Sequence, residues 1–210
     1  MVNLPIASPV RMNVISSSAP WVLPGAGLSV FYGRPEALRL SHYFLPRVLL
    51  GGGRVLYIDG GNRFDPLLLA RMARQRGREP SEFNECVRVA RAFTCFQLTE
   101  LLIQAPRLLD KFPSQVLIAT GIPELYLDED VRECEATASF RKALEALRAL
   151  QELPLATSVF SDATSFPTPR RTLFTQLVAQ ADCVSQFVER DGCLTLVSKR
   201  ATLRLSQPSP

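Results

Sequence analysis

Short apolar runs alternate with longer amphipathic runs along most of the chain. Four of the apolar runs are continuous and bounded by turn residues, which is typical of buried strands: residues 28–33, 54–59, 114–121 and 154–162. The amphipathic runs repeat their apolar positions at helical spacing, most clearly at Phe140, Leu144, Leu147 and Leu150. Strands that alternate with helices predict an α/β fold with a mainly parallel sheet covered on both faces.

Proline and glycine positions set the expected ends of the helices. Residues 35–50 predict one helix that opens at Pro35 and is kinked or ended by Pro46. Residues 65–77 predict a helix stopped by Gly77, and residues 97–112 and 135–153 predict two more. Residues 86–93 read as a short strand and a turn. A proline-rich loop then leads to a hairpin over 183–199, with Asp191-Gly192 suited to a two-residue turn.

The pattern predicts a simple domain organisation. Residues 1–26 carry four prolines and a serine run, so we expect an N-terminal arm there. Residues 27–205 then form a single α/β domain, and residues 206–210 form a frayed tail.

Composition narrows the class of protein. The 210 residues are 47% hydrophobic and 21% charged, which are globular values. The sequence has no apolar run of about 18 residues and no convincing secretory signal, so we expect a cytoplasmic protein that does not enter a membrane. Five cysteines without CxxC spacing, and a single histidine, exclude a Cys/His zinc site and indicate free thiols.

The net charge of +4 is only mildly basic, but the charges are unevenly placed. Arginine dominates the first 80 residues, including Arg71 and Arg74 on one expected helix and Arg78 directly after it. The balance reverses between residues 128 and 135, where five acidic side chains surround Arg132 alone. The acidic stretch opposes phosphate binding, whereas the arginine-rich helix favours it.

Three local motifs carry a family resemblance. They are "VLYIDGGNRFDP" at 55–66, "VRVARAFTCFQLTELL" at 87–102 and "VLIATG" at 116–121. Together with the order of elements, they resemble the ATPase core of the RecA/RadA recombinase family, in particular its archaeal and eukaryotic branch, over residues 24–200. The resemblance implies a RecA-like P-loop NTPase core with a mainly parallel sheet, flanking helices and a C-terminal antiparallel hairpin.

Compared by position, the phosphate-loop residues of that family are mostly replaced. Gly33 matches the loop's first glycine, but Leu38 stands for the glycine before the lysine. Arg39 stands for the lysine and Leu40 for the hydroxyl that binds Mg²⁺. A leucine would fill space that phosphates require, and Pro35 removes one N–H donor.

The two catalytic acids of the family are replaced as well. Gly61 stands where the glutamate that activates water belongs, and Thr120 stands at the Walker B aspartate. Asp59 remains and reads best as a cap or turn acid. The resemblance therefore leaves a degenerate nucleotide site of Gly33, Arg39 and Asp59, with no catalytic residue and no cofactor. His42 lacks a partnered acid and nucleophile in the same motif and reads as a packing or surface residue.

The family's two DNA-contacting loops correspond to residues 121–136 and 161–174. The first is acidic. The second offers Phe166, Arg170 and Arg171, which suit single-stranded nucleic acid by charge and stacking, or else form a solvated loop.

These features predict a binding protein: an accessory or regulatory module in DNA recombination or repair, without ATPase activity. It would act through a protein partner such as a RecA-type ATPase, or through self-association, with DNA as a further ligand. Trp21, Val22 and Leu23 on the arm are the candidate contacts, or else they pack on their own domain. The alternative is an ATP-binding ATPase of the same fold with relocated phosphate ligands, and a third reading is a structural dimer without nucleic acid.

Overall fold

A computed structural model describes residues 23–33, 37–162, 172–190 and 193–201. The strands, in chain order, are β1 (Gly27–Tyr32), β2 (Val55–Asp59), β3 (Val87–Arg91), β4 (Val116–Thr120), β5 (Ala156–Ser161), β6 (Cys183–Arg190) and β7 (Cys193–Ala201). The helices are α1 (Ala37–Leu40), α2 (Leu45–Leu50), α3 (Pro66–Arg74), α4 (Pro80–Glu85), α5 (Cys95–Lys111), α6 (Glu133–Leu150) and α7 (Thr172–Gln180), with 3-10 helices η1 (Ser41–Phe44) and η2 (Glu124–Leu127).

These strands form one sheet in the order β3-β2-β4-β5-β1-β6-β7. All neighbouring strands run parallel except β6 and β7, which form an antiparallel hairpin. The four strands that the apolar runs predict hold four consecutive places in this order, β2-β4-β5-β1. The predicted RecA-like α/β fold with a terminal hairpin is confirmed, although the Asp191-Gly192 turn lies outside the described residues.

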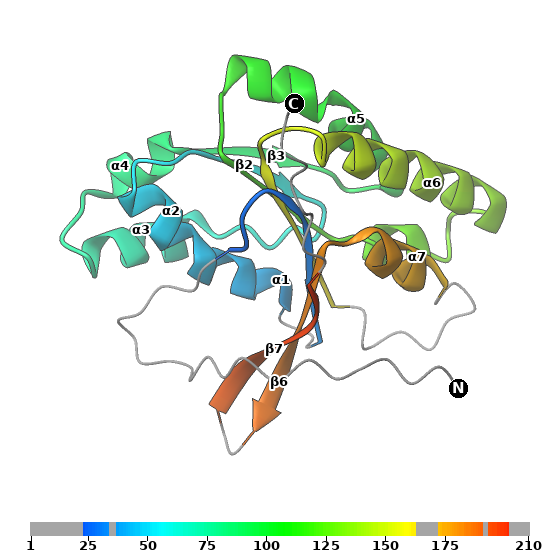
Figure 1. Ribbon diagram of the computed structural model, residues 1–210. Helices are drawn as coiled ribbons and strands as arrows, with labels where there is room; N and C mark the ends of the chain where they lie inside the picture. The colour runs from blue at the N-terminus through cyan, green and yellow to red at the C-terminus, as the bar shows by residue number, and fades with distance from the viewer. Residues whose placement is uncertain (1–22, 34–36, 163–171, 191–192, 202–210) are drawn as a thin grey trace, which may run out of the picture.

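Helices cover both faces of the sheet (Figure 1). The first four helices lie on one face, and α5, α6 and α7 lie on the other. Because strand side chains alternate between faces, Leu56 and Ile58 pack under α5 while Tyr57 between them packs on the opposite side. The sheet is therefore buried from both sides, which explains the continuous apolar runs of β2 and β4.

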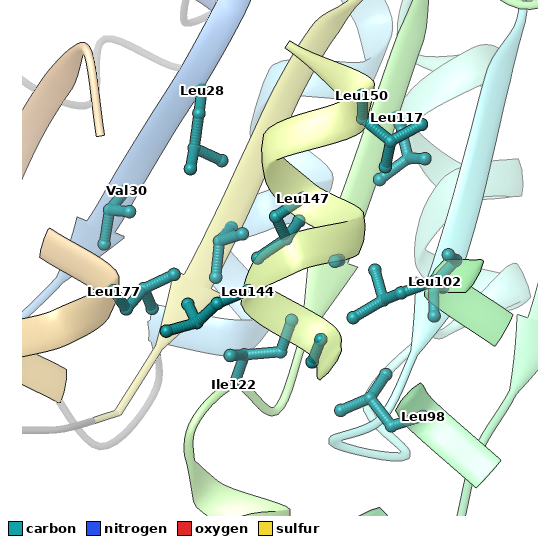
Figure 2. Packing of buried hydrophobic residues seen from close by; sticks show 14 of the residues in the cluster. Leu28, Val30, Leu98, Leu102, Leu117, Ile122, Leu144, Leu147, Leu150 and Leu177 are labelled. Carbon is teal, nitrogen blue, oxygen red and sulfur yellow. The ribbon is translucent and has the colours of Figure 1, made fainter. Parts of the chain in front are cut away.

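The longest helix, α6, confirms its predicted apolar face. Phe140, Leu144, Leu147 and Leu150 are all buried. Figure 2 shows α6 lying across the sheet, with its leucines among residues of the strands and of α5. Each fully buried leucine contributes about 1.5–3 kcal/mol relative to an exposed one, so this face is a main support of the fold.

Residues 37–50 of the helix predicted over 35–50 form a continuous helical run, but it is not one α-helix and Pro46 does not end it. The segment divides into α1, η1 and α2, and Pro46 lies in the first turn of α2, where its missing N–H is tolerated. The Ser41 hydroxyl donates to the Leu38 carbonyl and the His42 ring bonds the Arg39 carbonyl, so side chains take up carbonyls that an α-helix would use.

Two helices lie where none was expected. Helix α7 occupies residues that read as the end of a proline-rich loop, and α4 is a short helix in which the Glu79 and Glu82 side chains form a capping box. Helix α6 also begins at Glu133 rather than at Glu135. These two acids therefore lie in its first turn, where their charge interacts favourably with the helix dipole and stabilises the helix.

Candidate functional site

The ends of β1, β2, β4 and β5 meet at the carboxyl edge of the sheet. Open parallel sheets bind ligands outside this edge, so a functional site is expected there. Gly33 follows β1 and Asp59 ends β2 at this edge, with Thr120 at the end of β4 and Asp162 after β5, whereas Arg39 lies on α1.

Asp59 organises the loop that follows β2. Its carboxylate accepts hydrogen bonds from the backbone N–H groups of Arg63 and Phe64, both at 3.0 Å, and from the Thr120 hydroxyl at 3.1 Å. The Arg91 guanidinium lies 3.7 Å from the same carboxylate and also bonds Asn62 and the Phe64 carbonyl. This fully buried acid thus acts as a turn acid with its oxygens engaged, in agreement with the interpretation from sequence.

Leu38 lies directly over Gly61. A Cβ added to Gly61 would stand 2.6 Å from the Leu38 Cδ1, so a side chain at residue 61 would require the leucine to move. Leu38 itself is 5% exposed and belongs to the buried cluster between the sheet and α1–α4. The side chain at the loop position therefore occupies the space next to residue 61.

The backbone of Leu38 is engaged by an acid. Its N–H donates to the Asp162 Oδ1 at 3.3 Å, across from the end of β5. In a phosphate loop such an amide would face a phosphate oxygen. Here an internal carboxylate lies against it.

Gly33 ends β1 with a positive φ of 123° and approaches β6 closely. A Cβ there would lie 2.6 Å from the Phe187 carbonyl oxygen, so no other residue fits without movement. The next three positions, which include Pro35 and Glu36, lie outside the described residues.

Arg39 is exposed on α1, and its charge acts on Asp65 at the start of α3. Asp65 caps α3 by accepting from the N–H groups of Leu67 and Leu68, and these bonds hold the pKa of its carboxyl below the usual range. Arg39 remains a predicted site residue that no contact in the described structure ties to a ligand.

His42 is a buried packing residue that links two elements. Its Nε2 accepts from the Asp65 N–H at 2.9 Å, so its Nδ1–H donates to the Arg39 carbonyl at 3.0 Å. Burial lowers the pKa of the imidazole, which is therefore neutral at pH 7. The ring packs against Tyr57 and Phe64, and burial raises the pKa of the Tyr57 phenol, whose hydroxyl donates to Ser41.

Glu124 is a site residue that the sequence did not single out. It opens η2 after β4, and its Oε1 accepts from the Ser161 hydroxyl at 2.7 Å and from the Asp162 N–H. Burial raises the pKa of this carboxyl to about 7, and the neighbouring Asp162 charge adds to the rise. Asp162 could have been found because it directly follows a predicted strand at the ligand-binding edge. Glu124 gave no such signal.

The acidic segment after β4 is anchored to the domain. Tyr126 is fully buried. Its hydroxyl forms a hydrogen bond of 2.8 Å with the Thr99 hydroxyl, and its ring meets the Phe140 ring edge-on, with the centroids 5.1 Å apart. Only the stretch at residues 128–130 is wholly exposed between η2 and Val131. Residues 121–127 of the expected DNA-contacting loop at 121–136 are thus packed on the domain, whereas residues 128–130 and 132–135 are exposed.

Only some of the candidate residues for nucleic-acid and partner contacts lie among the described residues. Phe166, Arg170 and Arg171 lie outside the described residues, as do Trp21 and Val22. Leu23 is half-buried and packs on the buried cluster beneath α1–α4, which supports packing on its own domain. On α3, Arg71 and Arg74 are exposed, whereas Arg78 pairs with Glu82 at 3.3 Å.

Two kinds of site are not found in the described part of the chain. Its His, Cys, Asp and Glu side chains form no group of three or more that could hold a metal ion. None of its helices is both long and apolar enough to span a membrane.

Comparison with known proteins agrees with the resemblance of the motifs. The family model for Rad51 matches residues 43–163, more than half of the 210-residue chain. A search of curated proteins found no match. The matched region runs from η1 to the residue after Asp162 and so includes β2, β4, β5 and most of the carboxyl edge. The chain therefore belongs to the Rad51 family, the RecA-like proteins of recombination and repair.

Proposed function

We propose that this protein is a Rad51-family accessory module that neither holds Mg²⁺-ATP tightly nor hydrolyses it. The observation that carries the proposal is the contact of Leu38 with Gly61. The leucine takes the space that a bound phosphate needs, and the glycine leaves no acid to activate water. On this reading the chain is a paralogue of the archaeal and eukaryotic branch with degenerate Walker motifs.

The electrostatics of the carboxyl edge support the same conclusion. The Leu38 N–H donates to the Asp162 carboxylate, and the Asp162 N–H donates in turn to the Glu124 carboxyl. A phosphate brought to this place would meet negative charge instead of free N–H donors. The Thr120 hydroxyl, at the Walker B position, donates to Asp59, so it is engaged in holding the loop.

An exposed apolar surface supports a role through protein partners. Phe93, Phe96 and Ile103 are 63%, 49% and 48% exposed. Phe96 and Ile103 line a surface hollow between α5 and α6. Large apolar side chains gathered at a surface are typical of protein interfaces. The partner is a RecA-type ATPase or a second copy, and DNA is a further ligand.

Isothermal titration of the purified protein with Mg²⁺-ATP tests the central claim, with an active RecA-type ATPase as the positive control. We expect no heat of binding at micromolar concentrations and no phosphate release in a parallel hydrolysis assay. Binding of ATP at low micromolar Kd with a magnesium requirement would instead favour an ATPase with relocated phosphate ligands.

A further inference from the structure

One oxygen of the Glu124 carboxyl is hydrogen-bonded, and the other has no hydrogen-bond partner among the described residues. Its Oε1 accepts two hydrogen bonds, from the Ser161 hydroxyl and the Asp162 N–H. Its Oε2 is buried and has no hydrogen-bond partner among the described residues. A buried carboxylate oxygen without a donor is costly, and protonation of that oxygen removes the charge at no loss of the two existing bonds.

The surroundings of Glu124 favour the neutral acid. Among the described residues, the charged group that faces it is the Asp162 carboxylate, at the end of β5. Helices α5 and α6, which pack against η2, present the uncharged Thr99, Ser139 and Phe140 to this segment around Tyr126. Burial is the main cause that raises the pKa of Glu124 from 4.5 to about 7. The hydrogen bonds from Ser161 and Asp162 act against this rise, and the Asp162 charge adds a smaller rise.

Asp162 connects this carboxyl to α1. Its backbone N–H donates to Glu124, and its side-chain Oδ1 accepts from the Leu38 N–H at 3.3 Å. We call the set of Glu124, Ser161, Asp162 and the Leu38 amide the carboxyl clasp. It joins the ends of β4 and β5 to the start of α1 at the edge where a parallel sheet binds ligands.

We propose that the carboxyl clasp is a proton-dependent latch: it holds α1 against the end of β5 while Glu124 is neutral, and it loosens when Glu124 ionises beside Asp162. An ionised Glu124 repels the Asp162 side-chain carboxylate, which is the acceptor of the Leu38 N–H, while the bonds from the Ser161 hydroxyl and the Asp162 N–H hold the backbone at the end of β5. The latch does not depend on the proposed accessory role, because its readout is the stability of the chain without any ligand.

The sign of the effect on stability follows from the pKa in the two states. In the unfolded chain Glu124 ionises near 4.5, and in the folded protein it keeps its proton up to about 7. The folded state therefore binds more protons within this window, so the clasp stabilises the fold at low pH. Its contribution falls as pH rises from about 4.5 to about 7 and is constant above that.

Thermal unfolding from pH 4.5 to 8.5 tests the latch with the variant Glu124→Gln. The amide keeps an oxygen for the two donors and places an uncharged NH₂ at the buried position. We expect the variant to match the wild-type Tm at pH 4.5 and to exceed it progressively up to pH 7–8. His42 also titrates, but it is present in both proteins, so its contribution cancels in the difference. The control Glu129→Gln, an exposed acid in the same segment, should give a difference that does not vary across this range.

Two measurements keep the test decisive if Glu124→Gln folds poorly. The first is carboxyl NMR of wild-type protein, in which we expect the Glu124 resonance to titrate near pH 7 and to move to lower pH in Asp162→Asn. The second is hydrogen exchange, in which the protection factor of the Leu38 amide should fall several-fold between pH 5.5 and 8. Parallel Tm profiles of wild type and Glu124→Gln, a Glu124 midpoint between 4 and 5, or a Leu38 protection factor independent of pH would each overturn the latch.

Discussion

The Leu38 Cδ1 lies 2.6 Å from the point where a Cβ on Gly61 would stand. The two positions, 23 residues apart in the sequence, are thus in contact through the Leu38 side chain. A side chain at 61 needs either a smaller residue at 38 or a shift of the Leu38 side chain. The residue types at the two positions are therefore coupled.

This relationship predicts coupled effects on stability. Gly61→Ala should destabilise the protein by about 1–3 kcal/mol through overpacking. Leu38→Ala should cost about 2–3 kcal/mol by itself, since the side chain is buried. In the double variant the methyl group enters the space that the leucine leaves, so the loss should be smaller than the sum by about 1 kcal/mol.

Urea unfolding of the four proteins measures the coupling. Gly51→Ala is a matched control, because its φ of −79° suits alanine and an added Cβ would meet neighbours only at 3.4 Å or more. This control should be neutral or slightly stabilising. Additive losses at positions 38 and 61 would show that the two residues are not coupled.

Restoring the loop lysine should not restore nucleotide binding. In Arg39→Lys the steric defect at Leu38 and the carboxylate at Asp162 both remain, and Leu40 still offers no hydroxyl to a metal ion. We expect titration with Mg²⁺-ATP to give no more heat for Arg39→Lys than for the wild type. Micromolar binding in this variant would mean that the arginine, and not the leucine contact, had excluded ATP.

The histidine makes a separate prediction. His42→Phe keeps a ring between Tyr57 and Phe64 but removes the partners of the Arg39 carbonyl and the Asp65 N–H. We expect a loss of about 2–6 kcal/mol at pH 7.5, from about 1–3 kcal/mol for each of the two backbone groups left without a partner. Chemical unfolding measures this loss, and equal stability of the variant would contradict the linking role.

The same variant should change the response to acid. Burial lowers the pKa of His42 in the folded protein, so below its unfolded value of 6.5 the unfolded state binds the extra proton. The wild type should therefore lose stability from this group as pH falls below about 6.5, and His42→Phe should lack that part of the loss. A wild-type acid loss identical to that of His42→Phe would contradict the assignment.

The parts of the fold that follow from a repeating pattern could be predicted, and those that follow from single contacts could not. Strand β4 is a continuous apolar run because both its faces are buried, so its position could be predicted from the sequence. The change from α1 to the 3-10 helix η1 depends on hydrogen bonds of the Ser41 hydroxyl and the His42 ring to nearby carbonyls, which periodicity does not reveal. Helix α7 is short and follows two prolines closely, so it read as loop.

The candidate site divides in the same way. The motifs assign Leu38, Gly61 and Thr120 to family positions, and this assignment stays a prediction. Their contacts could not be predicted, because the approach of Leu38 to Gly61 depends on how α1 lies on the sheet. Glu124 was hidden for the same reason: its segment looks like a solvated acidic loop, whereas in the fold its carboxyl bonds the Ser161 hydroxyl and Tyr126, two residues later, is buried.

The last prediction concerns DNA. If the protein contacts DNA, binding should be modest, independent of ATP and sensitive to salt, because bound phosphates release their counterions. The predicted contacts are Arg170 and Arg171, assisted by Arg71 and Arg74, which are exposed on α3. Fluorescence anisotropy with labelled single- and double-stranded oligonucleotides across a salt series measures both the affinity and its slope.

Paired substitutions separate the two basic elements. Arg170→Ala with Arg171→Ala should lower the salt slope by about one to two units, at roughly one unit for each phosphate that the variant no longer binds. Arg71→Ala with Arg74→Ala removes the same charge from α3 and serves as the matched variant, with a smaller effect if the helix only assists. Neutralising the exposed acids at residues 128–130 should raise affinity, because they repel the phosphates from a segment that Tyr126 holds in place. Equal slopes for the two arginine pairs would mean a general response to net charge, and no binding of either oligonucleotide at low salt would leave protein partners as the sole ligands.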